Sequence, residues 1–459
     1  MSSAAREARI RVIGAGLAGC EAAWQAARMG VSVDLYEMKP SKYTPAHHSP
    51  KFAELVCSNS LRSADTSNAV GLLKAELSRL GSLMMEAAHA TEVPAGSALA
   101  VDREKFSSYI TDKIRSHPLI TVHEEEVASP SLDVPTVVAT GPLTSDALSH
   151  WIEELMGGEG LHFYDAAAPI VDAATVDTNI AFFASRYGKG EPSDYLNCPF
   201  TKEEYDAFYR ELIAAETAAL KEFDANAQAE PTVFEGCMPV EVMAKRGVDT
   251  LRYGPMKPVG LPDPKTGREA YAIVQLRREN REGTMYNLVG FQTHLTFPEQ
   301  RRVFRMIPGL ANAAFFRYGV MHRNTYLRSP GVLTPYYSMK SQKNLFFAGQ
   351  MTGVEGYVES ASSGFVAGVN AAKTALSQAC VDFPATTEIG ALAHYVSESP
   401  SPNFQPMNAN FGIIAPLPAK VKGGKAARNL VYAERALSAV DSLLQGELAC
   451  LSASERETP

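Results

Sequence analysis

A glycine-rich turn between a short apolar strand and a helix constrains the fold of this chain more than any other feature. The segment reads IRVIGAGLAGCEAAWQAARMG over residues 10–30, with the pattern G-x-G-x-x-G. Such a turn lets backbone amides and the positive end of a helix dipole approach a pyrophosphate. A second apolar strand at Val31–Glu37 ends in a carboxylate placed where an adenosine ribose needs an acceptor. These features predict a dinucleotide site with the following residues: Gly14, Ala15, Gly16, Leu17, Ala18, Gly19 and Glu37.

A second strand, glycine loop and helix stand near the C-terminus. Residues 344–348 (NLFFA) form the expected strand, GQMTGVEGYVES the loop, and residues 361–375 a helix rich in small side chains. The start of such a helix can face the pyrimidine edge of a flavin, where negative charge develops on reduction. This placement favours FAD over NAD. The cofactor-binding residues expected in the loop are Gly349, Gln350, Gly353, Glu355, Gly356 and Tyr357.

The two glycine loops predict an α/β fold, namely a Rossmann-like FAD-binding domain of the glutathione reductase type with an inserted α+β domain. We assign residues 1–193 and 330–459 to the two parts of the FAD-binding domain, and residues 194–329 to the insertion. Smaller features predicted from periodicity are helices at Gly71–Ala90 and Lys202–Ala225, strands at Ile120–Val127 and Thr136–Gly141, and a linker at 188–199.

The composition bounds the class of protein and its partners. Six scattered cysteines without a C-x-x-C pair favour neither a disulfide framework nor a zinc cluster, and we predict no metal site. No secretory h-region and no apolar run of membrane-spanning length is present, so we expect a cytoplasmic protein. The net charge of −8 argues against nucleic acid, yet residues 240–330 hold 15 Lys and Arg against 7 Asp and Glu. This basic sector is either an RNA-binding face or a solvated surface.

Two cysteines are candidates for a reactive thiol. Cys237 lies in FEGCMPVEVMAKRG, where neighbouring lysine and arginine could lower a thiol pKa and create a nucleophile. Cys57 lies in a long polar loop, ELVCSNSLRS. The alternative for either residue is an inert small core side chain.

Several segments together point to one family. They are IGAGLAGCEAAWQ, ELVCSNSLRS, VDREKF, FEGCMPVEVMAKRGVDTLRYGPMKPVGL, NLVGFQTHLTFPEQ and FAGQMTGVEGYVESASSG. In this order, from near residue 9 to about residue 440, the chain resembles the bacterial folate- and FAD-dependent tRNA (uracil-5-)-methyltransferases, the TrmFO family. It is also similar to the longer flavin subunit that modifies wobble uridines (MnmG/GidA), but without the extended helical C-terminus of that protein.

The resemblance implies methylation of C5 of the T-loop uracil, position 54, in tRNA. The carbon donor would be 5,10-methylenetetrahydrofolate, and the reductant FADH2 regenerated by NADPH or NADH. By the same resemblance, Cys237 is the nucleophile that adds to C6 of uracil, Cys57 is a second active-site cysteine near the flavin, and His294 covers the pterin ring.

The RNA would meet the basic sector. The T-arm of tRNA is the expected partner, and no obligate protein partner is inferred. Arginines suited to phosphates are Arg277, Arg278, Arg281, Arg301, Arg302 and Arg305, and aromatic residues suited to an unpaired base are Tyr253, Phe315, Phe316 and Tyr318.

Three other functions stay open on the sequence. The same chemistry could act on a ribosomal RNA uridine, because such an enzyme would share nearly all these motifs. A flavin oxidoreductase of a small molecule would leave the basic sector merely solvated. A flavin-bearing RNA-binding protein without catalysis would tolerate the loss of Cys237.

Overall fold

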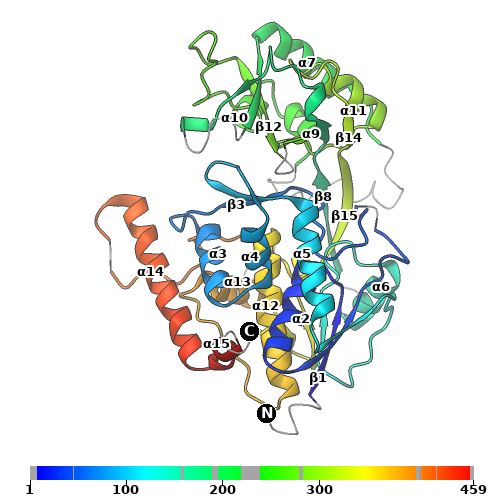
Figure 1. Cartoon of the computed structure of the whole chain (residues 1–459), viewed down its shortest axis with the longest axis vertical. Helices are drawn as coiled ribbons and strands as arrows, with labels where there is room; N and C mark the ends of the chain where they lie inside the picture. The colour runs from blue at the N-terminus through cyan, green and yellow to red at the C-terminus, as the bar shows by residue number, and fades with distance from the viewer. Residues whose placement is uncertain are drawn as a thin grey trace.

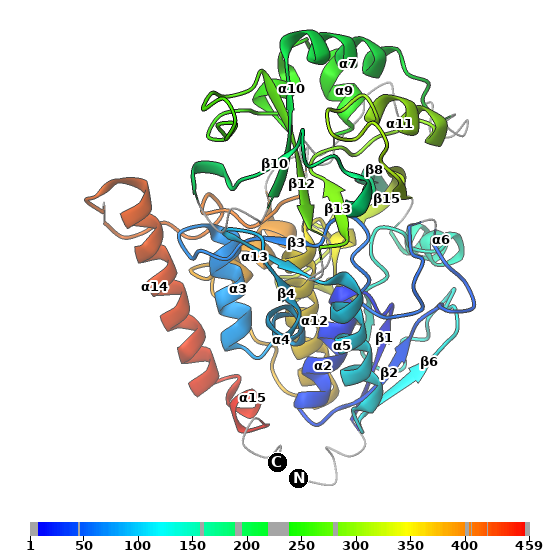
Figure 2. The same ribbon diagram turned by 45° about the horizontal axis from the view of Figure 1, so that its top comes forward.

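Two sheet-containing units joined by a two-stranded ribbon make up the protein (Figure 1). The computed structural model describes residues 8–44, 46–156, 160–188, 195–218, 238–278, 283–399, 404, 406–419 and 421–454. Figure 2 shows the smaller unit, with α7, α9, α10 and α11, at the end of the molecule opposite α15. In the described part of the chain, no helix combines the length and the apolar character that crossing a bilayer requires.

The larger unit is built on a six-stranded sheet in which all neighbours except β16 and β17 run parallel. Its central strands are short and apolar, and Ile10, Val12 and Val137 are completely buried. Because the carboxyl ends of parallel strands meet at one edge, the turns after β1 and β7 lie side by side. In spatial order the strands are β16 (Ser338–Met339), β17 (Gln342–Phe347), β7 (Thr136–Val138), β1 (Arg9–Ile13), β2 (Ser32–Tyr36) and β6 (Ile120–His123).

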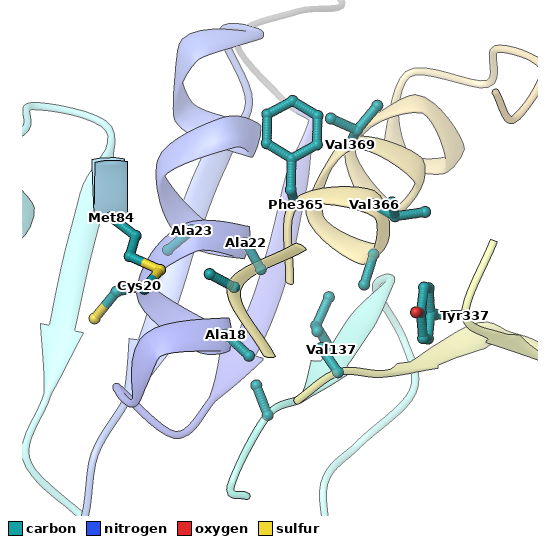
Figure 3. Packing of buried hydrophobic residues seen from close by; sticks show 14 of the residues in the cluster. Ala18, Cys20, Ala22, Ala23, Met84, Val137, Tyr337, Phe365, Val366 and Val369 are labelled. Atoms are coloured by element: carbon teal, nitrogen blue, oxygen red, sulfur yellow. The ribbon is translucent and has the colours of Figure 1, made fainter. Parts of the chain in front are cut away.

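Helices α2 (Leu17–Arg28) and α12 (Tyr357–Ala375) pack closely against each other on this sheet. A Cβ atom at Gly364 would lie 2.2 Å from the carbonyl oxygen of Ala18, and one at Gly368 would lie 2.5 Å from the Cα of Ala22. Figure 3 shows the side chains at this crossing, with Phe365 beside α2. Small residues on both helices therefore bring the two glycine loops together, although more than 300 residues separate them in sequence.

The remaining elements of the larger unit surround this core. A small antiparallel sheet contains β3 (Ser60–Ser63), β5 (Ala98–Val101) and β4 (Glu92–Val93). The other helices are α3 (Ala69–Arg79), α4 (Leu83–Ala90), α5 (Arg103–Ser116), α6 (Asp146–Leu155), α13 (Glu388–Glu398), α14 (Gly424–Gln445) and α15 (Ala449–Ser454).

The smaller unit contains a second, antiparallel sheet with helices packed around it. Its strands, in spatial order, are β10 (Phe182–Phe183), β11 (Tyr195–Phe200), β12 (Ala272–Arg278), β13 (Met285–Leu288), β9 (Ile170–Asp172) and β14 (Phe315–Arg317). Its helices are α7 (Lys202–Ala214), α9 (Val240–Lys245), α10 (Thr250–Tyr253) and α11 (Phe297–Phe304). A separate apolar core, with Phe208, Phe291 and Phe304 at its centre, stabilises this unit.

The limits of the smaller unit differ from those expected at 194 and 329. Strand β10 pairs with β11 and strand β9 with β13, so the second sheet includes residues on both sides of position 194. The connection is the ribbon of β8 (Gly160–Ala167) and β15 (Val320–Leu327), which pair along their whole length. We therefore place the smaller unit between these two strands. A boundary based on composition missed them because β9 pairs with β13, which lies more than 100 residues later in the chain.

Several predicted elements are shorter, divided or displaced. The helix expected over Gly71–Ala90 is two helices, because Gly81 has a φ of +75° and the Ser82 side chain caps α4. The strand expected over Ile120–Val127 ends at His123. Residues 195–199 of the expected linker belong to strand β11, and the helix predicted from Lys202 ends at Ala214.

Candidate functional site

The first glycine loop lies against the end of β7. A Cβ at Gly14, whose φ is +96°, would lie 2.7 Å from the Ala139 carbonyl oxygen, and one at Gly19 would lie 1.7 Å from the Gly14 carbonyl oxygen. A side chain at either position would therefore force neighbouring backbone to move. A Cβ at Gly16 meets no atom within 4 Å, because this residue faces an open cleft. The loop thus offers backbone to the cleft at Gly16 and is fixed by close contacts on either side.

The N-terminus of α2 points at the same cleft. Gly16 is the N-cap residue, and no described side chain caps this end of the helix. The first backbone N–H groups of α2 are consequently open to an anionic ligand, and the helix dipole adds partial positive charge. An open glycine and an uncapped helix N-terminus together fit the pyrophosphate of a dinucleotide.

Glu37, the residue after strand β2, lines the cleft, and its role as the ribose acceptor stays a prediction. Its carboxylate is 8% exposed and accepts hydrogen bonds from the backbone N–H groups of Ala15 (2.9 Å) and Lys39 (3.0 Å). Each carboxylate oxygen keeps a second lone pair, so the two hydroxyl donors of a ribose can still bind. The backbone contacts fix the orientation of the acceptor.

The cleft consists of two adjoining hollows of about 650 and 870 Å³, open to solvent at their mouths. Gly16, His47 and Thr140 line both hollows, so the two are continuous. The first contains Glu37, and the second contains Cys57, Gly141, Gly349, Gln350 and Tyr357. A ligand with its diphosphate at Gly16 therefore places its other end beside Cys57 and the second glycine loop.

The second glycine loop is strongly bent. Gly349, Gly353 and Gly356 have φ values of +86°, +88° and +118°, a region that favours glycine. Gln350 donates a hydrogen bond to Glu355 (2.9 Å), which stabilises the loop. Helix α12 begins at Tyr357, four residues before the predicted start, and no described side chain caps it. The loop thus delivers an uncapped helix N-terminus to the Cys57 end of the cleft.

Tyr357 holds the backbone of the cysteine loop. Its hydroxyl oxygen accepts hydrogen bonds from the N–H groups of Cys57 (2.7 Å) and Ser58 (3.1 Å). Burial raises the pKa of the Tyr357 phenol, so this residue stays neutral near pH 7. Tyr357 lines the cleft as predicted, but it also positions Cys57, which the sequence did not indicate.

Arg103 is a residue of the site that the sequence reasoning missed. Its guanidinium donates hydrogen bonds to the carbonyl oxygens of Leu55 and Cys57, the latter at 3.3 Å. Asp102 caps α5 by accepting from the N–H groups of Glu104 and Lys105. The signal was the VDREKF segment, in which a capping aspartate and an arginine follow a buried strand.

His294 lies in the smaller unit, beside a buried carboxylate. Its Nδ1 is 3.3 Å from an oxygen of Glu241, and its backbone N–H donates to the same oxygen at 2.8 Å. The hydroxyl of Thr293 donates to the other oxygen of Glu241 (2.8 Å). Glu241, on the first turn of α9, fixes the imidazole orientation. That His294 covers a pterin stays a prediction. Cys237 lies outside the described residues.

The predicted RNA-binding arginines differ widely in exposure. Arg277 is only 8% exposed and binds Ser58 and Asn59 of the larger unit, so its assignment to an RNA surface is wrong. Its neighbour Arg278 is half-buried, and Arg281 lies outside the described residues. On and after α11, Arg301 and Arg302 are exposed, while Arg305 donates twice to the Ala313 carbonyl oxygen.

Of the two exposed arginines on α11, Arg302 forms ion pairs and Arg301 contacts an aromatic residue. Arg302 pairs with Glu211 and with Glu299 (2.7 Å), and these carboxylates raise its pKa. Arg301 donates to the hydroxyl of Tyr318 at 3.0 Å, and Tyr318 stacks on Phe297 with ring centroids 5.0 Å apart. An exposed cation beside stacked aromatic rings suits RNA, whereas Arg302 must exchange its carboxylate partners for a phosphate.

A family model described as glucose inhibited division protein A matches residues 9–379. A curated Listeria monocytogenes protein named methylenetetrahydrofolate--tRNA-(uracil-5-)-methyltransferase TrmFO is 58% identical over 434 residues, or 95% of this chain and 98% of the relative. The protein of the same name from Acetivibrio thermocellus is 60% identical over 428 residues, covering 93% and 97%. The solved structure of Aquifex aeolicus GidA superposes with a TM-score of 0.68 at 19% identity, covering 100% of this chain and 77% of that one.

Proposed function

This chain belongs to the glucose inhibited division protein A family and, within it, to the TrmFO methyltransferases, and from that premise we infer that it is a folate-dependent tRNA (uracil-5-)-methyltransferase. The observation that carries this conclusion is the high identity to TrmFO relatives along nearly the full length of both chains. The carbon donor is methylenetetrahydrofolate and the reductant is a flavin. We propose that NADPH or NADH regenerates the reduced flavin.

The cleft of the larger unit fits FAD. The open Gly16, the first turn of α2 and Glu37 would hold its adenosine diphosphate, and the loop from Gly349 to Gly356 would hold the isoalloxazine end. When bound, FAD supplies the reducing equivalent that turns a transferred one-carbon unit into a methyl group.

Two cysteines are proposed to take different roles in the reaction. C5 of uracil becomes nucleophilic only after a thiolate has added at C6, and we assign that addition to Cys237. Cys57 is proposed as the second active-site thiol, which its place on the lining of the flavin-side hollow supports. Tyr357 and Arg103 hold the backbone around Cys57, so this thiol has a defined direction. His294, oriented by Glu241, is proposed to cover the pterin ring.

The target is proposed to be the T-loop uracil at position 54 of tRNA. A base within a folded loop must be extruded before its C6 can meet a thiol, and the exposed aromatic residues of the smaller unit could stack a displaced base. Because tRNA is the substrate, we propose a cytoplasmic location. Among the residues that the structure describes, no particular contact favours ribosomal RNA or a small molecule.

The decisive experiment is a methyl-transfer assay with purified protein. Methylenetetrahydrofolate labelled in the transferred carbon, NADPH and an unmodified tRNA transcript are expected to yield labelled 5-methyluridine, detected by nucleoside mass spectrometry. The Cys237→Ala variant should lose at least 1,000-fold in rate, on the order of losing a covalent nucleophile. A transcript with cytidine at position 54 is the matched RNA control. Labelling of that transcript, or of a ribosomal RNA fragment instead, would contradict the proposed target.

Charge reversal on α11 tests the proposed RNA face. The double variant Arg301→Glu/Arg302→Glu should bind tRNA roughly 10-fold more weakly at 0.1 M salt, with a salt slope smaller by about two, because two phosphate contacts are lost. Its FAD content should stay unchanged, because neither residue lines the cleft. Filter binding across a salt series measures both quantities. Unchanged affinity and slope would place the RNA on another surface.

A further inference from the structure

Arg277 joins the smaller unit to the loop that carries Cys57. Its Nη2 donates to the hydroxyl oxygen of Ser58 at 2.5 Å, and its Nε donates to the side-chain oxygen of Asn59 at 3.0 Å. The side-chain amide nitrogen of Asn59 in turn donates to the carbonyl oxygen of Arg278 at 2.7 Å. Three hydrogen bonds therefore connect two consecutive loop residues to the end of strand β12.

The contact is buried, so water does not compete with it. Asn59 is completely buried and Arg277 is 8% exposed. Burying a guanidinium is costly unless its N–H groups find partners. Within the described residues, no carboxylate forms an ion pair with Arg277, and the polar side chains of the Cys57 loop provide its hydrogen-bond acceptors. A simple surface role does not explain an arginine in this place.

The other side of the same loop is fixed by the larger unit. Tyr357 accepts from the N–H groups of Cys57 and Ser58, and Arg103 donates to the Cys57 carbonyl oxygen. Asn59 also donates to the carbonyl oxygen of Val101 at 3.1 Å. The segment from Cys57 to Asn59 is thus held between the two units, and Arg277 supplies the side-chain hold from the smaller one.

We propose that Arg277 is a positioning residue, through which docking of the smaller unit sets the direction of the Cys57 thiol in the cleft. The inference rests on the proposed function of Cys57. Arginine suits this role because its planar guanidinium can donate to two acceptors at once, whereas the lysine ammonium is a single compact charge. A smaller unit that shifts when it engages RNA or folate would move the cysteine through this contact.

The test compares Arg277→Ala, Arg277→Lys and the control Arg268→Ala as FAD-loaded proteins. Arg268 is an exposed arginine of the same unit without a place in the site, so it matches the loss of charge. We expect Arg277→Ala to lower kcat for tRNA methylation 10- to 100-fold with KM for tRNA changed less than 3-fold. Alkylation of Cys57 by iodoacetamide, followed by peptide mass spectrometry, should change at least 5-fold in rate. Arg277→Lys should fall between Arg277→Ala and the wild type.

A second variant covers the case in which Arg277→Ala fails to fold. Ser58→Ala removes one acceptor with a minimal change of volume, and it should reproduce part of both effects. Combined with Arg277→Lys it should be less than additive, because the two changes remove the same hydrogen bond. Equal kcat and equal Cys57 alkylation in Arg277→Ala and Arg268→Ala would overturn the inference. A wild type that alkylates normally but methylates no tRNA would instead overturn the proposed function.

Discussion

Replacing Gly16 with alanine is expected to weaken FAD binding strongly while the apoprotein stays folded. The backbone of Gly16 (φ −75°, ψ −172°) is extended, a conformation open to alanine, and the added Cβ meets no protein atom within 4 Å. That free space is where a pyrophosphate must approach the backbone. We expect the dissociation constant for FAD to rise at least 100-fold, measured by quenching of flavin fluorescence.

The matched control is Gly19→Ala in the same turn. Its Cβ would lie 1.7 Å from the Gly14 carbonyl oxygen, so the helix and the strand must separate. Overpacking of this kind costs typically about 1–3 kcal/mol of stability and occasionally more. Thermal melts of the FAD-free proteins should therefore show a lower midpoint for Gly19→Ala and an unchanged one for Gly16→Ala. If Gly16→Ala binds FAD with normal affinity, the pyrophosphate does not bind at this turn.

The nucleotide-binding turn was predictable because local interactions determine it. Strand β2 lies within one residue of its predicted limits, strand β1 and helix α2 flank the glycine turn as predicted, and Glu37 lines the cleft. The glycine spacing, the apolar periodicity and the terminal acid all lie within thirty residues of one another. The second glycine loop followed for the same reason, although its helix starts earlier than expected.

Features that depend on distant partners were not predictable. The apolar periodicity from residue 71 to 90 continues through the break at Gly81, because α3 and α4 both bury side chains in one core. Arg277 was counted as a surface charge, since the residue type does not reveal that its acceptors lie 218 and 219 positions earlier. Composition likewise gave no sign that β9 and β10 belong to the second sheet.

Glu76 is a further group that the sequence did not single out. It is completely buried, and its two carboxylate oxygens accept hydrogen bonds from the N–H groups of Glu388 (2.8 Å) and Ile389 (2.9 Å) at the start of α13. Helix α3 thereby caps a helix more than 300 residues away in the chain. Burial nevertheless raises the pKa of Glu76 from 4.5 to about 7. The neighbouring Glu388 has its pKa raised as well, by burial and by the charge of Glu76.

The raised pKa makes stability depend on pH in a defined direction. Between about pH 4.5 and 7 the folded state binds more protons at Glu76 than the unfolded state, so stability falls as the pH rises through this window. A shift of this size corresponds to about 3 kcal/mol at 1.36 kcal/mol per pKa unit, and the coupling to Glu388 acts in the same sense. The contribution is fully present below about pH 4.5 and is lost above about pH 7.

The variant Glu76→Gln should distinguish the stability that comes from capping α13 from the effect of ionising a buried carboxylate. Its amide keeps one acceptor oxygen, but its NH2 group faces a backbone N–H and leaves that donor unsatisfied, which costs about 1–3 kcal/mol. At pH 5 we therefore expect a thermal midpoint roughly 1–4 °C below the wild type. This difference in thermal midpoint should shrink towards pH 8, because there only the wild type is destabilised by an ionised buried carboxylate. Glu92→Gln, at an exposed position of the same unit, controls for the loss of a surface charge. Scanning calorimetry from pH 5 to 8 measures this difference, and one that is constant or widens with pH would show that Glu76 is ionised throughout.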